Sequence, residues 1–173
     1  MQEYQLEQNI AGINFSKLID LCFSYASYFS LTGFVYNTSV IVESSEIYKC
    51  LLPYMCESIL TEHWFRNYVV EPNRLNVFIY KIDHFSKKKQ LEIIKNYISD
   101  LYMDNLFEYD SQTRSASLED LCFFSGNRLF LGTVSHEGLC SLFPNNNEMK
   151  SGFFKLGKWQ KTEYDEEEHI RIW

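Results

Sequence analysis

The chain has 173 residues, with 16 lysine and arginine residues against 23 aspartate and glutamate residues, so its formal net charge is −7. Because domains commonly hold about 100–200 residues, we expect residues 1–173 to form a single domain. Hydrophobic residues make up 46% of the chain, which excludes disordered and fibrous classes of protein. The excess of acids disfavours a general nucleic-acid-binding domain, because such domains are usually basic.

The N-terminal residues lack the pattern of a secretory signal, because no basic start is followed by an apolar segment. No apolar run reaches the roughly 18–20 residues that a membrane-spanning helix needs. The five cysteines sit among apolar neighbours, as buried free thiols do, and are Cys22, Cys50, Cys56, Cys122 and Cys140. We therefore expect a cytoplasmic protein with reduced cysteines in its core, without cofactor, metal or membrane contact.

The first third of the sequence predicts a helix followed by a strand. Residues 14–26 carry apolar side chains at the i, i+3, i+4, i+7 spacing of a helix that is buried on one face. Residues 28–36 are rich in β-branched and aromatic side chains, which predicts a strand, and Gly33 within it predicts a bulge. A second, short strand is expected at residues 40–42.

A long helix is predicted from Glu46 to about Tyr68. Ser44 or Ser45 can cap its N-terminus, and Glu46 suits the first turn because an acid there complements the helix dipole. Pro53 is expected to kink or split this helix. The apolar positions that predict it are Ile47, Leu51, Leu52, Met55, Ile59 and Leu60.

The middle of the chain predicts a buried strand and another amphipathic helix. Residues 75–82 follow a turn signal at residues 72–73 and have few polar interruptions, which is typical of a central strand. Asp83 or Ser86 can cap the helix that follows. Its apolar stripe consists of Leu91, Ile94, Ile98 and Leu101. Residues 110–117 predict a polar loop.

The last third of the sequence predicts a β-meander. Its three strands are expected at residues 118–124, 128–135 and 138–143, joined by turns at Gly126-Asn127 and Glu137-Gly138. Two further edge strands are expected at residues 152–156 and 169–173. The order of helices and strands predicts an α+β fold, in which helices pack on one face of a mainly antiparallel sheet with a C-terminal β-meander.

The tripeptide Ser135-His136-Glu137 combines a nucleophile, a base and a carboxylate. Because neighbouring residues of a strand point to opposite faces, adjacency alone cannot form a catalytic triad. Gly138 instead predicts a solvent-exposed polar turn at the tip of a hairpin. The glycines form no phosphate-binding loop, and the cysteines and histidines lack the spacing of a zinc site. We therefore expect no enzymatic activity, no catalytic residue and no metal ligand.

Two clusters of acids lie among aromatic residues, within residues 100–110 and 163–168. In the first cluster, Asp100, Asp104 and Glu108 fall at i, i+4 and i+8, so a continuing helix would carry them on one ridge. Such acids attract a cationic partner, and aromatic side chains anchor it. The predicted partner-binding residues are Asp100, Tyr102, Asp104, Glu108, Tyr109, Asp110, Trp159, Asp165, Glu166, Glu167 and Glu168. A solvated acidic surface that maintains solubility is the alternative interpretation.

The segment from Leu121 to Gly138, LCFFSGNRLFLGTVSHEG, is similar in style to hairpins of bacterial toxin-immunity proteins, including the contact-dependent growth inhibition immunity type. The similarity covers 18 of the 173 residues and accompanies the small size, the acidic charge and the missing catalytic motifs. The resemblance implies a bacterial protein that neutralises a cognate basic toxin domain, a nuclease, by stoichiometric blockade, without contacting nucleic acid directly.

Two other functions fit the same sequence. A phage-encoded inhibitor or a regulatory subunit would present the same acidic surface, and its gene neighbourhood would distinguish it from an immunity protein. A small enzyme would use His136, Glu137 or a thiol, and would need a deep pocket around His136.

Overall fold

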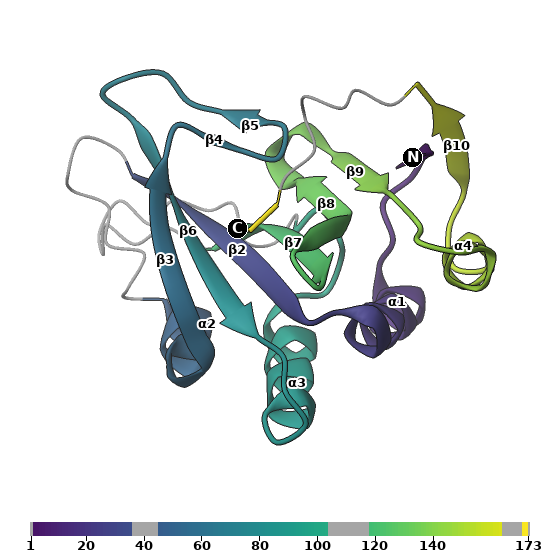
Figure 1. Ribbon diagram of the computed structural model, residues 1–173, viewed down its shortest axis with the longest axis horizontal. Coiled ribbons are helices and arrows are strands. Elements are labelled where there is room, and N and C mark those ends of the chain that lie inside the picture. Colours follow the sequence, from purple (N-terminus) through teal and green to yellow (C-terminus); the bar gives the residue numbers. More distant parts are fainter. Residues whose placement is uncertain (1, 36–44, 104–117, 164–170, 173) are drawn as a thin grey trace.

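The computed structural model describes residues 2–35, 45–103, 118–163 and 171–172. Within these residues the chain forms an eight-stranded sheet of antiparallel strand pairs and four α-helices (Figure 1). The strand order is β10-β1-β9-β8-β7-β2-β6-β3. The strands are β1 (Glu3–Leu6), β2 (Tyr28–Val35), β3 (Met55–Thr61), β6 (Arg74–Lys81), β7 (Glu119–Ser125), β8 (Arg128–Val134), β9 (Leu139–Leu142) and β10 (Trp159–Thr162). The helices are α1 (Gly12–Tyr25), α2 (Glu46–Leu51), α3 (Lys87–Tyr97) and α4 (Asn147–Phe154).

Helices α1, α2 and α3 lie on one face of the sheet (Figure 1), and apolar side chains from all four helices join the core on that face. The buried side chains of α1 include Phe15, Leu18 and Cys22, which are positions of the apolar spacing in the sequence. On the sheet, the rings of Phe29 and Tyr80 stack with their centroids 4.8 Å apart. The predicted α+β fold, with helices on one face of an antiparallel sheet and a C-terminal meander, is therefore confirmed.

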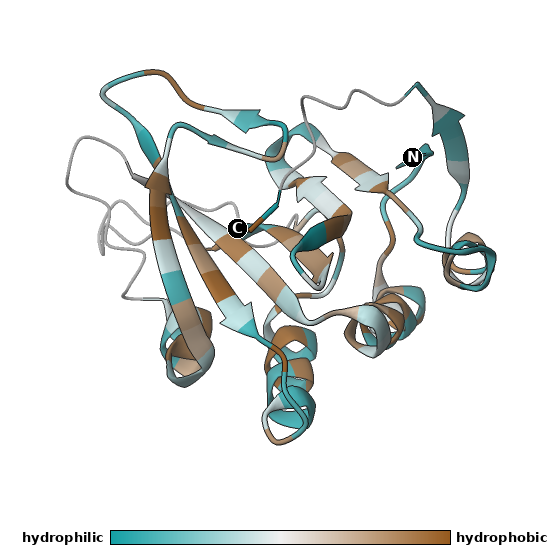
Figure 2. Cartoon of the chain, in the orientation of Figure 1, coloured by the Kyte–Doolittle hydropathy of each residue, from teal (hydrophilic) through white to brown (hydrophobic). Residues whose placement is uncertain are grey.

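The opposite face of the sheet carries a second apolar core beneath a small hairpin. This hairpin consists of β4 (His63–Trp64) and β5 (Asn67–Tyr68), and Figure 1 shows it on the side away from the helices. Trp64 and Phe65 pack against side chains of β6, β7 and β8, and Trp64 Nε1 donates a hydrogen bond to Ser30 Oγ at 3.2 Å. A Cβ on Gly132 would lie 3.0 Å from the Phe65 ring, so the glycine makes room for that ring. Figure 2 shows the hydrophobic residues of β2 and β6 between the two layers.

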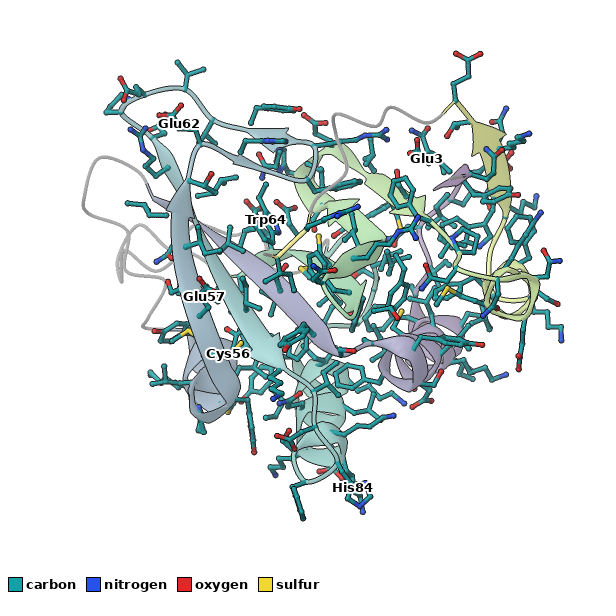
Figure 3. All side chains as sticks on the ribbon, in the orientation of Figure 1. Glu3, Cys56, Glu57, Glu62, Trp64 and His84 are labelled. Carbon is teal, nitrogen blue, oxygen red and sulfur yellow. The ribbon has the colours of Figure 1, made fainter. Side chains whose placement is uncertain are left out.

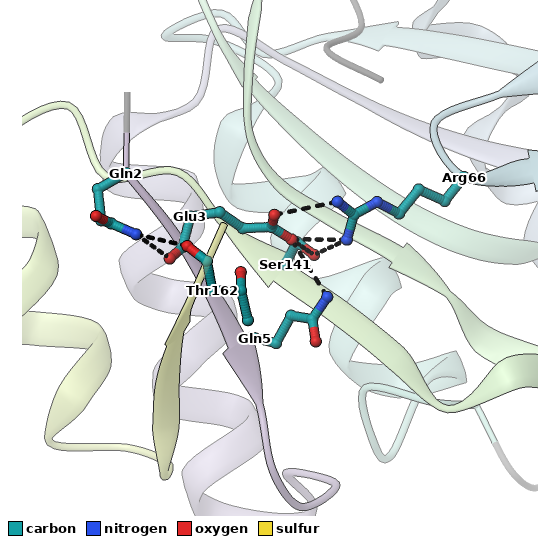
Figure 4. A network of polar contacts seen from close by, with 6 residues as sticks. All are labelled: Gln2, Glu3, Gln5, Arg66, Ser141 and Thr162. Carbon is teal, nitrogen blue, oxygen red and sulfur yellow. Dashed lines mark hydrogen bonds and ion pairs between the residues drawn. The ribbon is translucent and has the colours of Figure 1, made fainter. Parts of the chain in front are cut away.

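A buried ion pair connects the hairpin to the other half of the sheet (Figure 4). Arg66, in the turn of the hairpin, donates to both carboxylate oxygens of Glu3, at 2.7 and 3.1 Å. Ser141 Oγ donates to the same carboxylate at 2.6 Å, and Gln5 lies beside it at 3.5 Å. Since Glu3 is fully buried, this cationic partner compensates for the loss of its hydration.

The predicted helix from Glu46 to Tyr68 is wrong after its first turns. Ser45 does cap α2, accepting a hydrogen bond from Tyr48 N at 3.3 Å, but the helix ends at Leu51. A short 3-10 helix, η2 (Leu52–Tyr54), contains Pro53 and leads into β3. Because β3 is an edge strand with mainly exposed residues, its sequence lacks the alternation of a half-buried strand.

Three smaller predictions about the backbone are also wrong. Residues 152–156 belong mostly to α4, which Asn146 caps by accepting from Met149 N at 2.8 Å. Of residues 169–173, the described part makes only an isolated bridge, between Arg171 and Arg128. Gly33 pairs regularly with Asn76, and the bulge lies elsewhere, between β2 and β7. The strand expected at residues 40–42 and the loop at residues 110–117 lie outside the described residues.

All five cysteines are free, but they are not all core residues. Cys22, Cys122 and Cys140 are buried as expected, whereas Cys50 is half-buried and Cys56, on the edge strand β3, is exposed. Every helix in the described ranges is too short or too polar to cross a lipid bilayer.

Candidate functional site

Two acids at the start of β7 meet a histidine in the turn between β8 and β9. Because β7 and β8 are antiparallel neighbours, the first residues of β7 lie beside the last residues of β8. The chain leaves β8 through a 3-10 turn, η3 (Ser135–Glu137), which holds His136. Glu119, Asp120 and His136 thus have one ligand atom each within 4.8 Å of the others. In the part of the chain that the structure describes, they are the one such group of three acidic, histidine or cysteine residues.

A β-bulge in β7 explains how two consecutive acids reach the same place. Ser30 pairs with Cys122 and Thr32 pairs with Glu119, so Leu31 of β2 faces both Asp120 and Leu121. Asp120 adopts a left-handed backbone conformation, with φ 54°, which is uncommon outside glycine. A regular strand would send neighbouring side chains to opposite faces, and a bulge changes this alternation and redirects a side chain.

The Asp120 carboxylate is buried and held by donors from three parts of the fold. It accepts hydrogen bonds from Asn67 Nδ2 at 2.6 Å, from Ser135 N at 2.7 Å and from Thr32 Oγ1 at 3.1 Å. Its own backbone N–H donates to Ser135 Oγ at 3.0 Å. Burial raises the pKa of Asp120, and these donors, together with His136, oppose the rise because they favour the charged form.

Glu119 lies beside Asp120, and the described residues provide no comparable donors to its carboxyl group. Its side chain is 15% exposed, and its ion-pair partner in the described residues is His136, whose Nδ1 lies 3.9 Å from Glu119 Oε2. Burial first, and then the charge of Asp120, raise the pKa of Glu119 to about 8. The described donors surround Asp120 and oppose the rise of its pKa, and no described donor does the same for Glu119. The site can therefore bind a proton or a metal cation.

The tripeptide at residues 135–137 has a different arrangement from a triad. Ser135 is buried, and its hydroxyl accepts from the Asp120 backbone, whereas His136 and Glu137 are exposed. His136 approaches Glu119, not Glu137. The prediction of an exposed polar turn is thus confirmed for His136 and Glu137 and wrong for Ser135. Residue spacing could not identify Glu119 and Asp120, because the bulge that brings them together depends on strand pairing.

Of the predicted partner-binding residues, the structure describes Asp100, Tyr102 and Trp159. Helix α3 ends at Tyr97, so Asp100 is not part of it. Asp100 is buried and accepts from Asn9 Nδ2 at 2.9 Å. Trp159 is also buried and donates to the carbonyl of Phe153 at 3.0 Å, while Tyr102 is half-buried. Asp100 and Trp159 therefore stabilise the fold and do not present exposed contacts. The others lie outside the described residues: Asp104, Glu108, Tyr109, Asp110, Asp165, Glu166, Glu167 and Glu168.

An exposed apolar and acidic surface occurs elsewhere, where β3 leads into the β4–β5 hairpin and the chain returns to β6. Tyr68 and Val70 are 61% and 80% exposed. Glu62 and Glu71 flank them and share one cation, Arg74, at 3.0 and 2.8 Å. Figure 3 labels Glu62 at this end of the molecule, and Figure 2 shows the hydrophobic loop after β5. We call these four residues, Glu62, Tyr68, Val70 and Glu71, the hairpin surface.

Comparisons with protein-family models, with curated proteins and with solved structures give no match to the chain.

Proposed function

We propose that this chain is a cytoplasmic immunity protein that binds a basic toxin domain of the nuclease class and neutralises it by stoichiometric blockade. The observation that carries the proposal is the hairpin surface, which combines two exposed hydrophobic side chains with two acids. Such a surface suits a cationic partner, because carboxylates steer it during association and apolar side chains anchor it after water is expelled.

The charge of the chain supports a basic partner. The net charge is −7, and the two acids of the hairpin surface share a single arginine. The acidic stretches at residues 104–110 and 165–168 are predicted to add to the same attraction. In this proposal the protein occupies the toxin and catalyses nothing, so the group of Glu119, Asp120 and His136 is not needed for neutralisation.

The proposal is tested by co-expressing the chain with the product of its neighbouring gene and analysing the pair by size-exclusion chromatography. A 1:1 complex that abolishes the toxic activity of the neighbour is expected. If the neighbour has no toxic activity, or if it does not bind, the immunity function is wrong. A complex with a protein of a phage operon would instead favour the inhibitor or regulatory subunit.

The binding surface is tested separately with matched variants. Replacing Tyr68 and Val70 together by alanine should weaken the complex by about 10–100-fold, because exposed aromatic anchors commonly dominate binding energy. Phe85→Ala is the control, since Phe85 is 95% exposed but lies in the loop before α3. Binding that is lost equally in both variants, or in neither, would show that the partner contacts another surface.

The contribution of charge is tested by reversing two acids at a time. Glu62→Lys with Glu71→Lys should slow association most at low salt, because steering is screened by ions. The exposed pair Glu7→Lys with Glu148→Lys changes the net charge by the same amount away from the hairpin surface. Equal association rates for the two double variants would exclude local steering by the hairpin surface.

A further inference from the structure

We propose that Glu119, Asp120 and His136 form a binding site for a divalent transition-metal ion, with zinc as the expected ion. This inference does not depend on the proposed function. The group offers one imidazole nitrogen and two carboxylates, a ligand set that zinc accepts in proteins. Hard cations such as calcium prefer a larger set made only of oxygen ligands.

The distances suit a shared ion better than a direct contact. His136 Nδ1 and Glu119 Oε2 are 3.9 Å apart, which is too far for a hydrogen bond. Two ligand atoms that each lie roughly 2.0–2.2 Å from one zinc ion are about 3.0–3.6 Å apart when the coordination is close to tetrahedral. Since all three ligand atoms lie within 4.8 Å of one another, small side-chain rotations would bring them to these separations.

The surrounding residues hold one ligand in place before any ion arrives. Asn67, Ser135 and Thr32 donate to Asp120 from three separate elements, and this support resembles the outer hydrogen bonds that orient ligands around protein-bound metals. Oδ1 of Asp120 accepts only the backbone N–H of Ser135 in these contacts, so it retains a lone pair for an ion. The bulge at Asp120 fixes the backbone beneath it.

The electrostatics also favour a cation. Two neighbouring carboxylates are largely removed from water, and in the described ranges neither forms an ion pair with lysine or arginine. A divalent ion between them would compensate for both charges. His136 is 44% exposed and gives access from solvent, which leaves room for water as a further ligand.

Zinc titration of the full chain, after removal of metals with a chelator, tests the inference by isothermal calorimetry. One zinc ion should bind per chain, and His136→Ala and Glu119→Gln should each weaken binding by at least about tenfold, as loss of metal-supporting groups does. His84→Ala is the matched control, because His84 is exposed and follows the end of β6 that pairs with Tyr28, whereas Glu119 pairs with Thr32 near the other end of β2. Figure 3 labels His84 on this loop.

The possible outcomes distinguish a specific metal site from weak binding of zinc to the protein surface. No uptake of zinc at about 100 times the protein concentration would overturn the inference, as would equal affinity in the wild type, His136→Ala and Glu119→Gln. Calcium that binds as tightly as zinc would overturn the assignment to a transition metal. His136 is exposed, so His136→Ala should remain folded, and circular dichroism of each variant would check this.

Discussion

Replacing Arg66 by methionine removes the cation that compensates for a fully buried carboxylate, Glu3. Breaking a buried ion pair on one side commonly costs about 3–5 kcal/mol, because a charge is left without its partner. Ser141 still donates to Glu3, and the Arg66 side chain is 14% exposed, so water can partly replace the guanidinium. We therefore expect the lower limit, about 3 kcal/mol, which corresponds to a decrease in Tm of about 6–12 °C for a chain of this size.

The measurement is urea denaturation of three proteins: the wild type, Arg66→Met, and the double variant Glu3→Gln with Arg66→Met. In the double variant no buried charge is left without a partner, so its free energy of unfolding should lie within about 1 kcal/mol of the wild type. A cost below about 1 kcal/mol for Arg66→Met would refute the reasoning. So would a double variant that is as unstable as the single one, because packing and not charge would then explain the loss.

Two further predictions concern titration and thiol exposure. Because the pKa of Glu119 is raised from 4.5 to about 8, the native state keeps a proton that the unfolded state releases, so the metal-free protein should lose stability as pH rises from about 5 to 8. Glu119→Gln should flatten this decline, and parallel pH curves for variant and wild type in urea denaturation would contradict it. With iodoacetamide, Cys56 should react first and Cys50 more slowly in the native protein, as detected by mass spectrometry, because the other three thiols are buried. Equal labelling of all five would contradict the burial of those three.

The sequence predicts those elements whose own residues carry a clear local pattern. Helix α1 lies close to its predicted range because its apolar residues recur on one side of a helix. The meander strands β7, β8 and β9 do so because they are short apolar runs, buried on both faces of the sheet, and turn residues separate them. β3 differs because its position depends on pairing with β6 and not on its own pattern. The apolar residues of α2 and β3 together resemble one amphipathic helix, although the chain changes from helix to strand at Met55.

The candidate metal site was not predictable for a related reason. His136 stands out in the sequence within the tripeptide Ser135-His136-Glu137. The two acids that it meets, Asp120 and Glu119, lie at the start of β7, 16 and 17 positions earlier in the chain. Their approach requires the β7–β8 pairing and the bulge opposite Leu31, both of which depend on non-local contacts. Likewise, charge counting identified an acidic protein but could not show that Asp100 would be buried.

The position of β1 has a consequence for how the protein is made. β1 pairs with β9 on one side and β10 on the other, so residues 3–6 find both neighbours only in the last part of the chain. During synthesis β1 leaves the ribosome well before its partners and stays unpaired with them until residues 139–162 have emerged. Sheets built from such distant pairs fold slowly. Until β1 has paired with β9, that edge of β9 is open and another chain can pair with it. The protein should therefore be most prone to aggregate just after synthesis.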